Sequence, residues 1–453
     1  AARKHAGKGS STMLTALAFL GAVDSPHSSL VHEKQPGRNG LLRPPGKRHR
    51  VVVTGGAGYV GSHTVHALAR AGVYDLLVID NLESGHAEAV PRGVALKVLA
   101  LDDAVGVAAV LKAFRPHALI DFAAYLDVSH SQNEPEEYVR NNVQNFKHVL
   151  DAMHASGCEL IIKSSTQATY GDAPREEMPL HEGYNAEGTH RFASSNLAGG
   201  AWNGTAQSGP QIFERFLGAY TALSRREAWL RLTPSEVAML YTPRSVYGLS
   251  KLLDEVMLRK YAARHPALRW VSLRYGNVCG ADPAGFVGEA KRKPHTLMTL
   301  AMYSLLKHHA KAKGLQQGLH LYGHDYDTPD GTTVRDYVHP TDLAKAHLEA
   351  LKHLLDGRAS DVFNLGTGRG SSVLEVLRAV EYEAGRKVDY VIKGRRQGDC
   401  AFSVLDISKA RAVLGYAPAF NLSDMARTAW RWHAVQHEEF RGYAVSAESQ
   451  GAS

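Results

Sequence analysis

The chain has 453 residues, of which 44% are hydrophobic and 21% are charged, the composition of an ordinary globular protein. This length exceeds one minimal domain and predicts one large or two medium domains. The net charge of +7 comes from basic residues spread along the chain without an RNA-binding aromatic signature, so no nucleic-acid partner is predicted.

The N-terminal segment, residues 1–48, reads as a flexible or targeting extension. Its first part carries basic residues before the first acid and contains the apolar run Met13–Val23. A membrane span needs about 20 apolar residues, so this run predicts no stable membrane span. A signal h-region, part of a transit peptide and a flexible tail all remain open.

From residue 51 onward, apolar runs alternate with helical-length segments. Val51–Val53 is followed by a glycine-rich turn and a helix-like stretch, Ser62–Ala71, and a later helical segment covers Glu134–Ser156. Near-continuous apolar strands between helices are typical of a parallel sheet covered on both faces. The sequence therefore predicts an α/β fold with a doubly wound parallel Rossmann sheet, whose further strands are Leu76–Ile79, Ala95–Leu99, Ala118–Phe122, Glu159–Ile162 and Trp270–Arg274.

We expect two domains and an insertion. A dinucleotide-binding domain would cover 49–280, and a smaller mixed α/β substrate domain would cover 281–440, followed by a tail, 441–453. Residues 184–243 interrupt the alternation with a Gly/Ser/Asn-rich half and a helix-prone half. The insertion could be a lid, an oligomer contact or a packed surface element, and its apolar side chains are Phe213, Phe216, Leu217 and Trp229.

The glycine-rich turn has the residues that a dinucleotide site requires. Gly55, Gly58 and Gly61 allow a tight turn, close approach to a pyrophosphate, and close helix packing. The pyrophosphate then rests on the N-terminus of the helix. Asp80 ends the next strand, where a carboxylate can accept the ribose hydroxyls and would repel a 2′-phosphate. The predicted cofactor is therefore NAD.

Tyr247 and Lys251 form a candidate acid–base pair. Residues four apart lie on one face of a helix, which brings the ammonium near the phenol. A free tyrosine has a pKa of about 10, and we expect a neighbouring lysine and an oxidised nicotinamide to lower the pKa of Tyr247.

The cysteines and histidines show no metal-ligand or disulfide pattern. Cys158, Cys279 and Cys400 are odd in number and widely spaced, which excludes a disulfide framework and a CxxC metal site. No histidine lies in an HExxH or comparable spacing. We therefore expect no metal and a reducing compartment, by default the cytoplasm.

A collinear series of motifs resembles the UDP-glucose/UDP-sugar 4-epimerase family of extended short-chain dehydrogenases/reductases. The series runs through roughly residues 50–435 and includes TGGAGYVGSH, FAA, SSTQATYGD, YGLSK, LRYGN, DGTTVRDYVH, NLGTG and GRRQGD. The resemblance implies that Thr166, Tyr247 and Lys251 are catalytic. It implies a cofactor site that also contains Tyr59, Val60, Asn81, Phe122, Ala123, Asn142, Ser164 and Tyr275. The implied UDP-sugar site contains Asn277, Thr296, Leu297, Arg335, Arg396, Asp399 and Ser403.

Some positions depart from the family pattern. Ala100 stands where an Asp usually contacts adenine, Asp121 where a His precedes FAA, Gly276 where a Phe precedes the ligand-binding Asn, and Thr296 where an Asn contacts the diphosphate. Ser403 occupies a position that limits sugar size, and its small side chain suggests room for an N-acetyl group.

The resemblance implies NAD-dependent epimerisation at C4 of UDP-glucose/UDP-galactose through a 4-keto intermediate, by an expected homodimer. A UDP-pentose 4-epimerase is an alternative. A nucleotide-sugar 4,6-dehydratase would need an Asp-Glu pair where this chain has Gln167 and Ala168. An idle NAD-binding scaffold is a further alternative, since a fold does not guarantee function.

Overall fold

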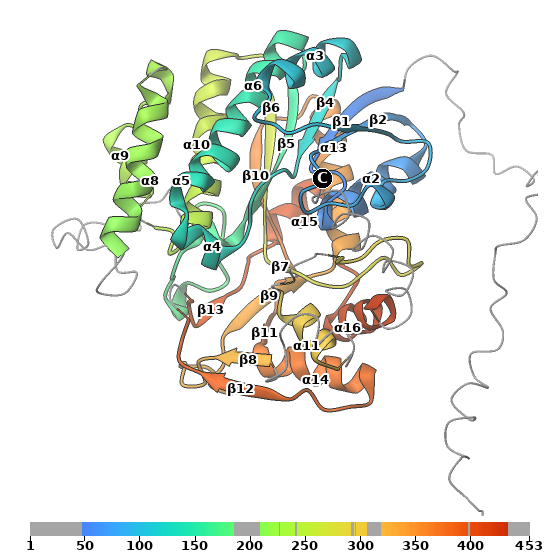
Figure 1. Ribbon diagram of the computed structural model, residues 1–453, viewed down its shortest axis with the longest axis vertical. Coiled ribbons are helices and arrows are strands. Elements are labelled where there is room, and N and C mark those ends of the chain that lie inside the picture. The colour runs from blue at the N-terminus through green and yellow to red at the C-terminus, as the bar shows by residue number, and fades with distance from the viewer. Residues whose placement is uncertain are drawn as a thin grey trace, which may run out of the picture. The chain divides into compact units, whose positions relative to one another are not determined.

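The computed structural model describes residues 48–184, 209–225, 227–240, 242–290, 294, 296–305, 319–396 and 399–433 (Figure 1). The predictions for residues 1–47, for the 185–208 part of the insertion and for the tail lie outside these described residues.

Within the described residues, seven parallel strands form the large sheet and confirm the predicted doubly wound architecture. In spatial order they are β10 (Asp361–Leu365), β6 (Arg269–Tyr275), β5 (Leu160–Thr166), β4 (Ala118–Asp121), β1 (His49–Thr54), β2 (Tyr74–Asp80) and β3 (Ala95–Val98). Six of these strands match the predicted apolar runs. The seventh, β10, was not predicted, because no strand of this sheet was expected after residue 280.

Both faces of the sheet are buried, as nearly continuous apolar strands require. Along β1, Val52 packs into one hydrophobic core, whereas Val51 and Val53 pack into another on the opposite face. The first face is covered by α3 (Ala104–Phe114), α6 (Asn145–Ser156) and α10 (Val246–Arg264). The second is covered by α2 (Tyr59–Ala71), α13 (Pro340–Leu355) and α15 (Ser408–Leu414) (Figure 1).

Short helical elements follow the carboxyl ends of β4 and β5. The predicted helical segment from residue 134 to 156 is helical but includes a π-helical stretch, and π-bulges often occur at functional sites. The elements are α4 (Val128–Asn133), α5 (Pro135–Tyr138), the π-helical η2 (Val139–Gln144), η3 (Gln167–Tyr170) and η4 (Arg175–Glu177), with η1 (Ala87–Ala89) after β2.

The helix-prone half of the insertion forms helices and packs on the first core. It contains α8 (Gly209–Ser224), η5 (Ala228–Leu230) and α9 (Pro234–Met239), which lie beside α5 and α10 in Figure 1. Phe213 and Phe216 are buried in the core, and Leu217 and Trp229 pack against it. Arg215 donates to both carboxylate oxygens of Glu136 at 2.7 and 2.6 Å. This half is therefore attached to the helices that surround the site described below.

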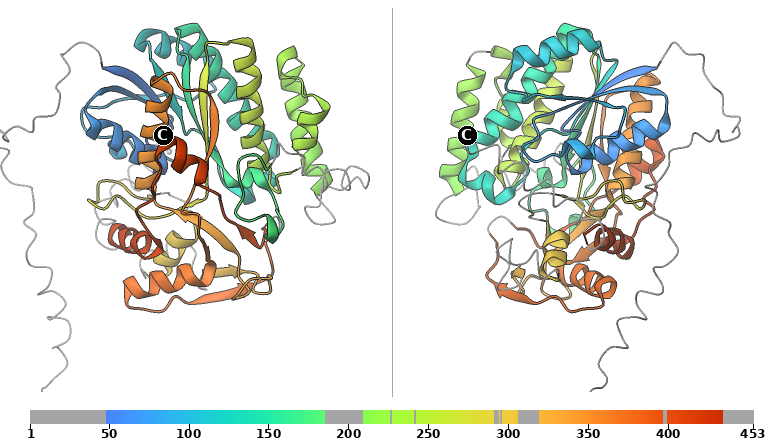
Figure 2. Two further views of the ribbon diagram at one scale, coloured as in Figure 1. Left: turned by 180° about the vertical axis from the view of Figure 1, so that it is seen from behind. Right: turned by 45° about the vertical axis from the view of Figure 1, so that its right-hand side comes forward.

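The smaller mixed α/β part is confirmed and lies at one end of the large sheet in both views of Figure 2. β9 (Val334–Val338) pairs with β11 (Gly370–Ser372), β13 (Phe402–Ser403) and β7 (Asn277–Val278), while β12 (Tyr390–Lys393) pairs with β8 (Leu319–Tyr322). Of these strands, β8 and β9 share a third core with α11 (Leu297–Leu305), α14 (Val373–Ala384) and α16 (Leu422–Arg431). Because β10 returns to the large sheet, the chain crosses between the two parts more than once.

None of the helices in the described ranges has the length and apolar character needed to cross a membrane.

Candidate active site

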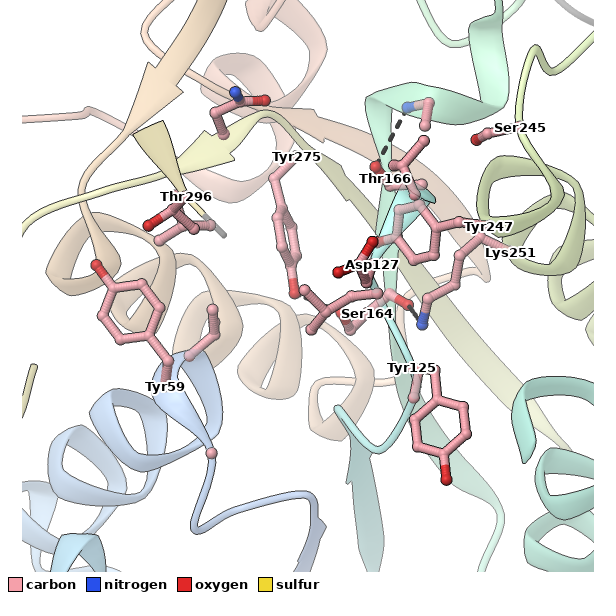
Figure 3. A pocket seen from close by; sticks show the side chains of 18 of the residues that line it. Tyr59, Tyr125, Asp127, Ser164, Thr166, Ser245, Tyr247, Lys251, Tyr275 and Thr296 are labelled. Atoms are coloured by element: carbon pink, nitrogen blue, oxygen red, sulfur yellow. Dashed lines mark hydrogen bonds between the residues drawn. The ribbon is translucent and has the colours of Figure 1, made fainter. Parts of the chain in front are cut away.

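A cavity of about 720 Å³ opens at the carboxyl ends of the large sheet and continues into the smaller part (Figure 3). Ligands of open α/β sheets bind in this place. The cavity is lined by every predicted site residue except Asn142. Its walls include Gly55, Gly58, Tyr59, Val60, Gly61, Asp80, Asn81, Phe122, Ala123, Ser164, Thr166, Tyr247, Lys251, Tyr275, Asn277, Thr296, Leu297, Arg335, Arg396, Asp399 and Ser403.

The glycine turn places the N-terminus of α2 directly against the end of β1. A Cβ on Gly61 would lie 2.2 Å from the carbonyl oxygen of Gly55, so only glycine fits at this contact. Gly58 is the N-cap residue, and no side chain caps the helix. The first backbone N–H groups of α2 are thus available to an anion, which fits a pyrophosphate.

Asp80 lines the cavity and also stabilises the neighbouring backbone. Its carboxylate accepts hydrogen bonds from the backbone N–H of Ala57 at 3.0 Å and of Leu82 at 2.9 Å. Burial raises the pKa of Asp80, while these two N–H groups oppose the rise. The Asp80 carboxylate therefore stabilises the glycine turn. It does so from the position at which it was predicted to bind a ribose.

Tyr247 is positioned by the first turn of α10. The Ser245 hydroxyl caps this helix by accepting from the Gly248 N–H at 3.1 Å. A Cβ on Gly248 would lie 2.5 Å from the Ala168 carbonyl oxygen, so glycine lets the helix approach the end of β5 closely. Figure 3 shows the Tyr247 ring between Thr166 and Lys251, with its hydroxyl directed toward the middle of the cavity.

The Tyr247–Lys251 pair differs electrostatically from the prediction. Burial raises the pKa of Tyr247 to about 12, and a hydrogen bond from Thr166 and the positive charge of Lys163 only partly oppose this rise. Burial also lowers the pKa of Lys251, and the like charge of Lys163 lowers it further. The protein groups alone therefore do not lower the pKa of Tyr247 as predicted, because desolvation outweighs the neighbouring charges, and the effect of an oxidised nicotinamide stays a prediction.

Asn142 does not line the cavity. Its side chain is buried, and its Nδ2 donates to the carbonyl oxygen of Tyr125 and to the Ser250 hydroxyl, both at 3.0 Å. Its Oδ1 accepts from the Tyr125 N–H at 2.8 Å. Asn142 therefore holds the loop after β4, whose residue Tyr125 does reach the cavity.

The opposite wall, from the smaller part, carries positive charge. Arg335 lies on β9, with its guanidinium 3.5 Å from the Asp399 carboxylate. The Arg396 guanidinium lies over the Tyr322 ring, 4.5 Å from its centroid. Ser403 is the β13 residue paired in register with Arg335. A planar cation held in this way can bind a phosphate with two hydrogen bonds.

Three of the departures from the family pattern have local explanations. Asp121 is buried and lies 2.6 Å from Lys163 Nζ. A Cβ on Gly276 would lie 2.1 Å from the Asp336 carbonyl oxygen, so a bulky residue cannot occupy this backbone position. The Thr296 hydroxyl donates to Glu289 at 2.5 Å.

Several lining residues were not predicted from the sequence, and two groups of them stand out. One is the loop after β4, which contributes Tyr125, Leu126 and Asp127, and the other is β8, which contributes His320 and Tyr322. The position of the loop at a strand's carboxyl end was an available signal. The sequence offered no equivalent signal for β8, which reaches the cavity only through the fold of the smaller part.

The comparisons with known proteins agree with this geometry. The model of the NAD dependent epimerase/dehydratase family matches residues 51–194 and 230–366, so the break falls inside the insertion. The chain is 36% identical over 384 residues to a UDP-glucose 4-epimerase of Azospirillum brasilense, covering 84% of this chain and 91% of that protein. A bovine UDP-glucose 4-epimerase is 32% identical, with coverage of 88% and 99%.

Solved structures of similar proteins share the fold. A UDP-glucose-4-epimerase from Stenotrophomonas maltophila, with bound NAD and formylated UDP-arabinopyranose, has a TM-score of 0.68 and 30% identity, covering 86% of this chain and 99% of that one. A Bifidobacterium longum UDP-glucose 4-epimerase in complex with NAD+ and UDP has a TM-score of 0.67 and 30% identity, with coverage of 85% and 98%. This chain belongs to the NAD dependent epimerase/dehydratase family.

Proposed function

We propose that this protein interconverts UDP-glucose and UDP-galactose by NAD-dependent epimerisation at C4, through a 4-keto sugar intermediate. The observation that supports this activity best is that one cavity brings together three groups of residues with different functions. It joins a glycine turn suited to a dinucleotide, a tyrosine–lysine pair, and an arginine-bearing wall suited to a nucleoside diphosphate. UDP-glucose 4-epimerases that are 36% and 32% identical to the chain support the same activity.

The protein's own residues would bind, orient and move one proton. A bound NAD supplies the acceptor for the C4 hydride and returns that hydride to the sugar. Tyr247 would take the proton of the sugar O4 hydroxyl and later give it back, and Thr166 would hold the same oxygen by a hydrogen bond. Lys251 would orient the nicotinamide ribose. The glycine turn, with Asp80 and Tyr275, would hold the cofactor in place between the two hydride steps.

The wall of the smaller part would bind the UDP moiety. Arg335 and Arg396 would bind the diphosphate, and Asp399 the uridine ribose, while Asn277, Thr296 and Leu297 would complete the site. Ser403 is buried but lines the cavity, so its small side chain leaves space near the sugar. We propose that this space admits an N-acetyl group. Turnover of UDP-N-acetylhexosamine below about a thousandth of the UDP-hexose rate would exclude that extension.

A UDP-pentose 4-epimerase is the second candidate. The specific observation in its favour is the formylated UDP-arabinopyranose bound to the Stenotrophomonas enzyme. A 4,6-dehydratase is less compatible with the site, because Gln167 and Ala168 carry no carboxyl group that could shuttle a proton. Instead, Gln167 donates to Asn277 at 3.2 Å.

The domain division, the oligomeric state and the cellular compartment of the protein are also proposals. We propose that the chain first passes from the NAD-binding part to the UDP-sugar-binding part near residue 280, with α13, β10 and α15 returning to the NAD-binding part. We also propose a homodimer and action in the cytoplasm. The three cysteines are free thiols in this structure, which is compatible with a reducing compartment. Light scattering of the purified protein would test the dimer.

The test of the activity is a substrate panel on the purified protein. Bound NAD is first measured by absorbance and mass spectrometry, and UDP-hexoses and UDP-pentoses are then assayed for epimerisation at C4. We expect bound NAD and fastest turnover of the UDP-hexoses. Faster turnover of UDP-xylose or UDP-arabinose would favour the second candidate. Bound NAD without epimerisation of any of these sugars would favour an idle scaffold.

A further inference from the structure

Three charged side chains form a buried cluster behind the tyrosine–lysine pair. Lys163 Nζ lies 2.6 Å from Asp121 Oδ2 and 3.0 Å from Asp254 Oδ2, and all three side chains are at most 1% exposed. The ammonium also lies 3.9 Å from the centre of the Phe146 ring. We call Asp121, Lys163 and Asp254 the buried triad.

The buried triad connects the chain segments whose residues line the cavity. Asp121 immediately precedes the cavity residue Phe122, and its Oδ1 accepts from the Ala123 N–H at 3.2 Å. It also accepts from the hydroxyl of Thr54, the residue before Gly55. The triad therefore links the glycine turn to the ends of β1 and β4.

The other two members link β5 to α10. Lys163 immediately precedes Ser164, whose carbonyl oxygen accepts a hydrogen bond from Lys251 Nζ at 3.0 Å. Asp254 lies three residues after Lys251 on the same helix, so the two side chains share one face. A shift of any triad member would therefore move one of the segments that hold the catalytic pair.

The charges of the triad balance that of Lys251. Burial raises the pKa of Asp254 to about 6, so above that pH the two carboxylates and one ammonium carry a net charge of −1, which offsets one lysine ammonium in the same buried region. The next carboxylate on α10, Glu255, is already paired with Arg274 at 2.6 Å and accepts from Ser165 at 2.6 Å.

The phenols of Tyr138 and Tyr275 also lie near the pair, and burial raises the pKa of both, as it does that of Tyr247. The Asp127 carboxylate lies beside Tyr247 in the cavity (Figure 3). The phenols carry no charge near neutral pH. The charged groups with the largest effect on Lys251 are the three of the triad, and Glu255 adds a smaller one, so the triad is the main balancing cluster.

A purely structural role explains this cluster poorly. Burying three charges carries a large desolvation cost that their pairing does little more than offset, so a well-packed apolar cluster would be about as stable. We propose that the buried triad is a positioning unit that keeps Lys251 charged and fixed against β5, and so sets the pH range over which Tyr247 can exchange its proton. This inference rests on the proposed function.

The triad predicts opposite effects for two single substitutions. Asp254→Asn removes a negative charge and is expected to lower the pKa of Lys251 by about 1, whereas Lys163→Met removes a positive charge and is expected to raise it by a similar amount. The double variant Lys163→Met/Asp254→Asn restores the charge balance and is expected to return the pKa close to the wild-type value.

Two measurements follow these shifts. Lysine side-chain NMR titrates Lys251 directly, with its resonance assigned by its loss in Lys251→Met. The pH profile of kcat for UDP-galactose should show its alkaline limb moving to lower pH in Asp254→Asn and to higher pH in Lys163→Met. Asp342→Asn is the matched control, because this α13 carboxylate is equally buried and accepts from the backbone N–H groups of Ala419 and Phe420.

Every outcome bears on the proposal. Shifts in the same direction, or no shift in folded single variants, would overturn it. If the single variants do not fold, the double variant decides: wild-type titration supports the triad, while a displaced pKa or failure to fold overturns it. A wild-type protein that epimerises no UDP-sugar would refute the proposed function, and the NMR titration would still test the triad.

Discussion

Lys251 Nζ donates a hydrogen bond to the carbonyl oxygen of Ser164 at 3.0 Å, so the lysine of the YxxxK motif is attached directly to β5. Thr166 ends the same strand two residues later. The helix that carries Tyr247 and the strand that carries Thr166 are therefore joined by a hydrogen bond inside the protein. This contact fixes the distance between the two groups that would share the sugar O4.

Replacing Tyr247 by Phe is expected to reduce epimerisation by a factor of about 10² to 10⁴, because no other group at this position can exchange the O4 proton. Bound NAD should be retained, since only one hydroxyl is lost. Tyr261→Phe is the matched control on the same helix: its hydroxyl donates to the Leu150 carbonyl oxygen, away from the cavity. Steady-state kinetics and absorbance of bound cofactor are measured. Equal activity of Tyr247→Phe and wild type would contradict the proposed acid–base role.

Gly61→Ala is expected to abolish stable NAD binding, because the new Cβ would lie 2.2 Å from the Gly55 carbonyl oxygen and push α2 away from β1. Gly218→Ala provides the control. Gly218 lies within α8, a Cβ there meets open space, and the change should stabilise the protein by up to about 1 kcal/mol. Thermal unfolding and mass spectrometry of bound NAD distinguish the two results. Full NAD content in Gly61→Ala would refute the tight-packing argument.

Arg396→Met is expected to raise the KM for UDP-glucose by about 10- to 100-fold, the cost of losing a hydrogen bond to a charged group. The neighbouring Arg395 also stacks on a tyrosine, Tyr326, but pairs with the exposed Asp325 and does not line the cavity. Arg395→Met should therefore leave the KM nearly unchanged. Kinetics of the two variants, together with inhibition by UDP, would measure the difference. Similar KM values for both variants would remove Arg396 from the diphosphate site.

Acid is expected to destabilise the protein through buried histidines. Burial lowers the pKa of His63 and of His347 to about 4 each, whereas an unfolded histidine has a pKa of about 6.5. The unfolded chain therefore binds these protons first, so the stabilisation is complete above about pH 6.5 and is lost as the pH falls toward about 4. Each histidine should account for about 2 kcal/mol between about pH 7.5 and about pH 5.

His347→Phe tests this pH dependence. Urea unfolding at the two pH values should give a free-energy difference smaller by about 2 kcal/mol than in the wild type. His353→Phe replaces a more exposed imidazole on the same helix and serves as the control. An unchanged difference in His347→Phe would show that this side chain is not kept neutral by burial.

The sequence by itself determined the local features. Apolar runs predicted six strands of the large sheet, and glycine spacing predicted the turn before α2, because strand period and turn geometry depend on neighbouring residues. The four-residue spacing of Tyr247 and Lys251 predicted one helix face for the same reason. Motif order predicted a set of site residues, and all of them except Asn142 line one cavity.

Only the tertiary structure decided which distant groups meet. It made β10 the seventh strand, since its partner β6 lies far back in the sequence, and it turned the Asn142 amide away from the cavity toward Tyr125. It also buried Lys163 between Asp121 and Asp254 and raised the pKa of Tyr247. Burial and charge pairing depend on everything packed around a group, and residue spacing along the chain carries no record of that environment.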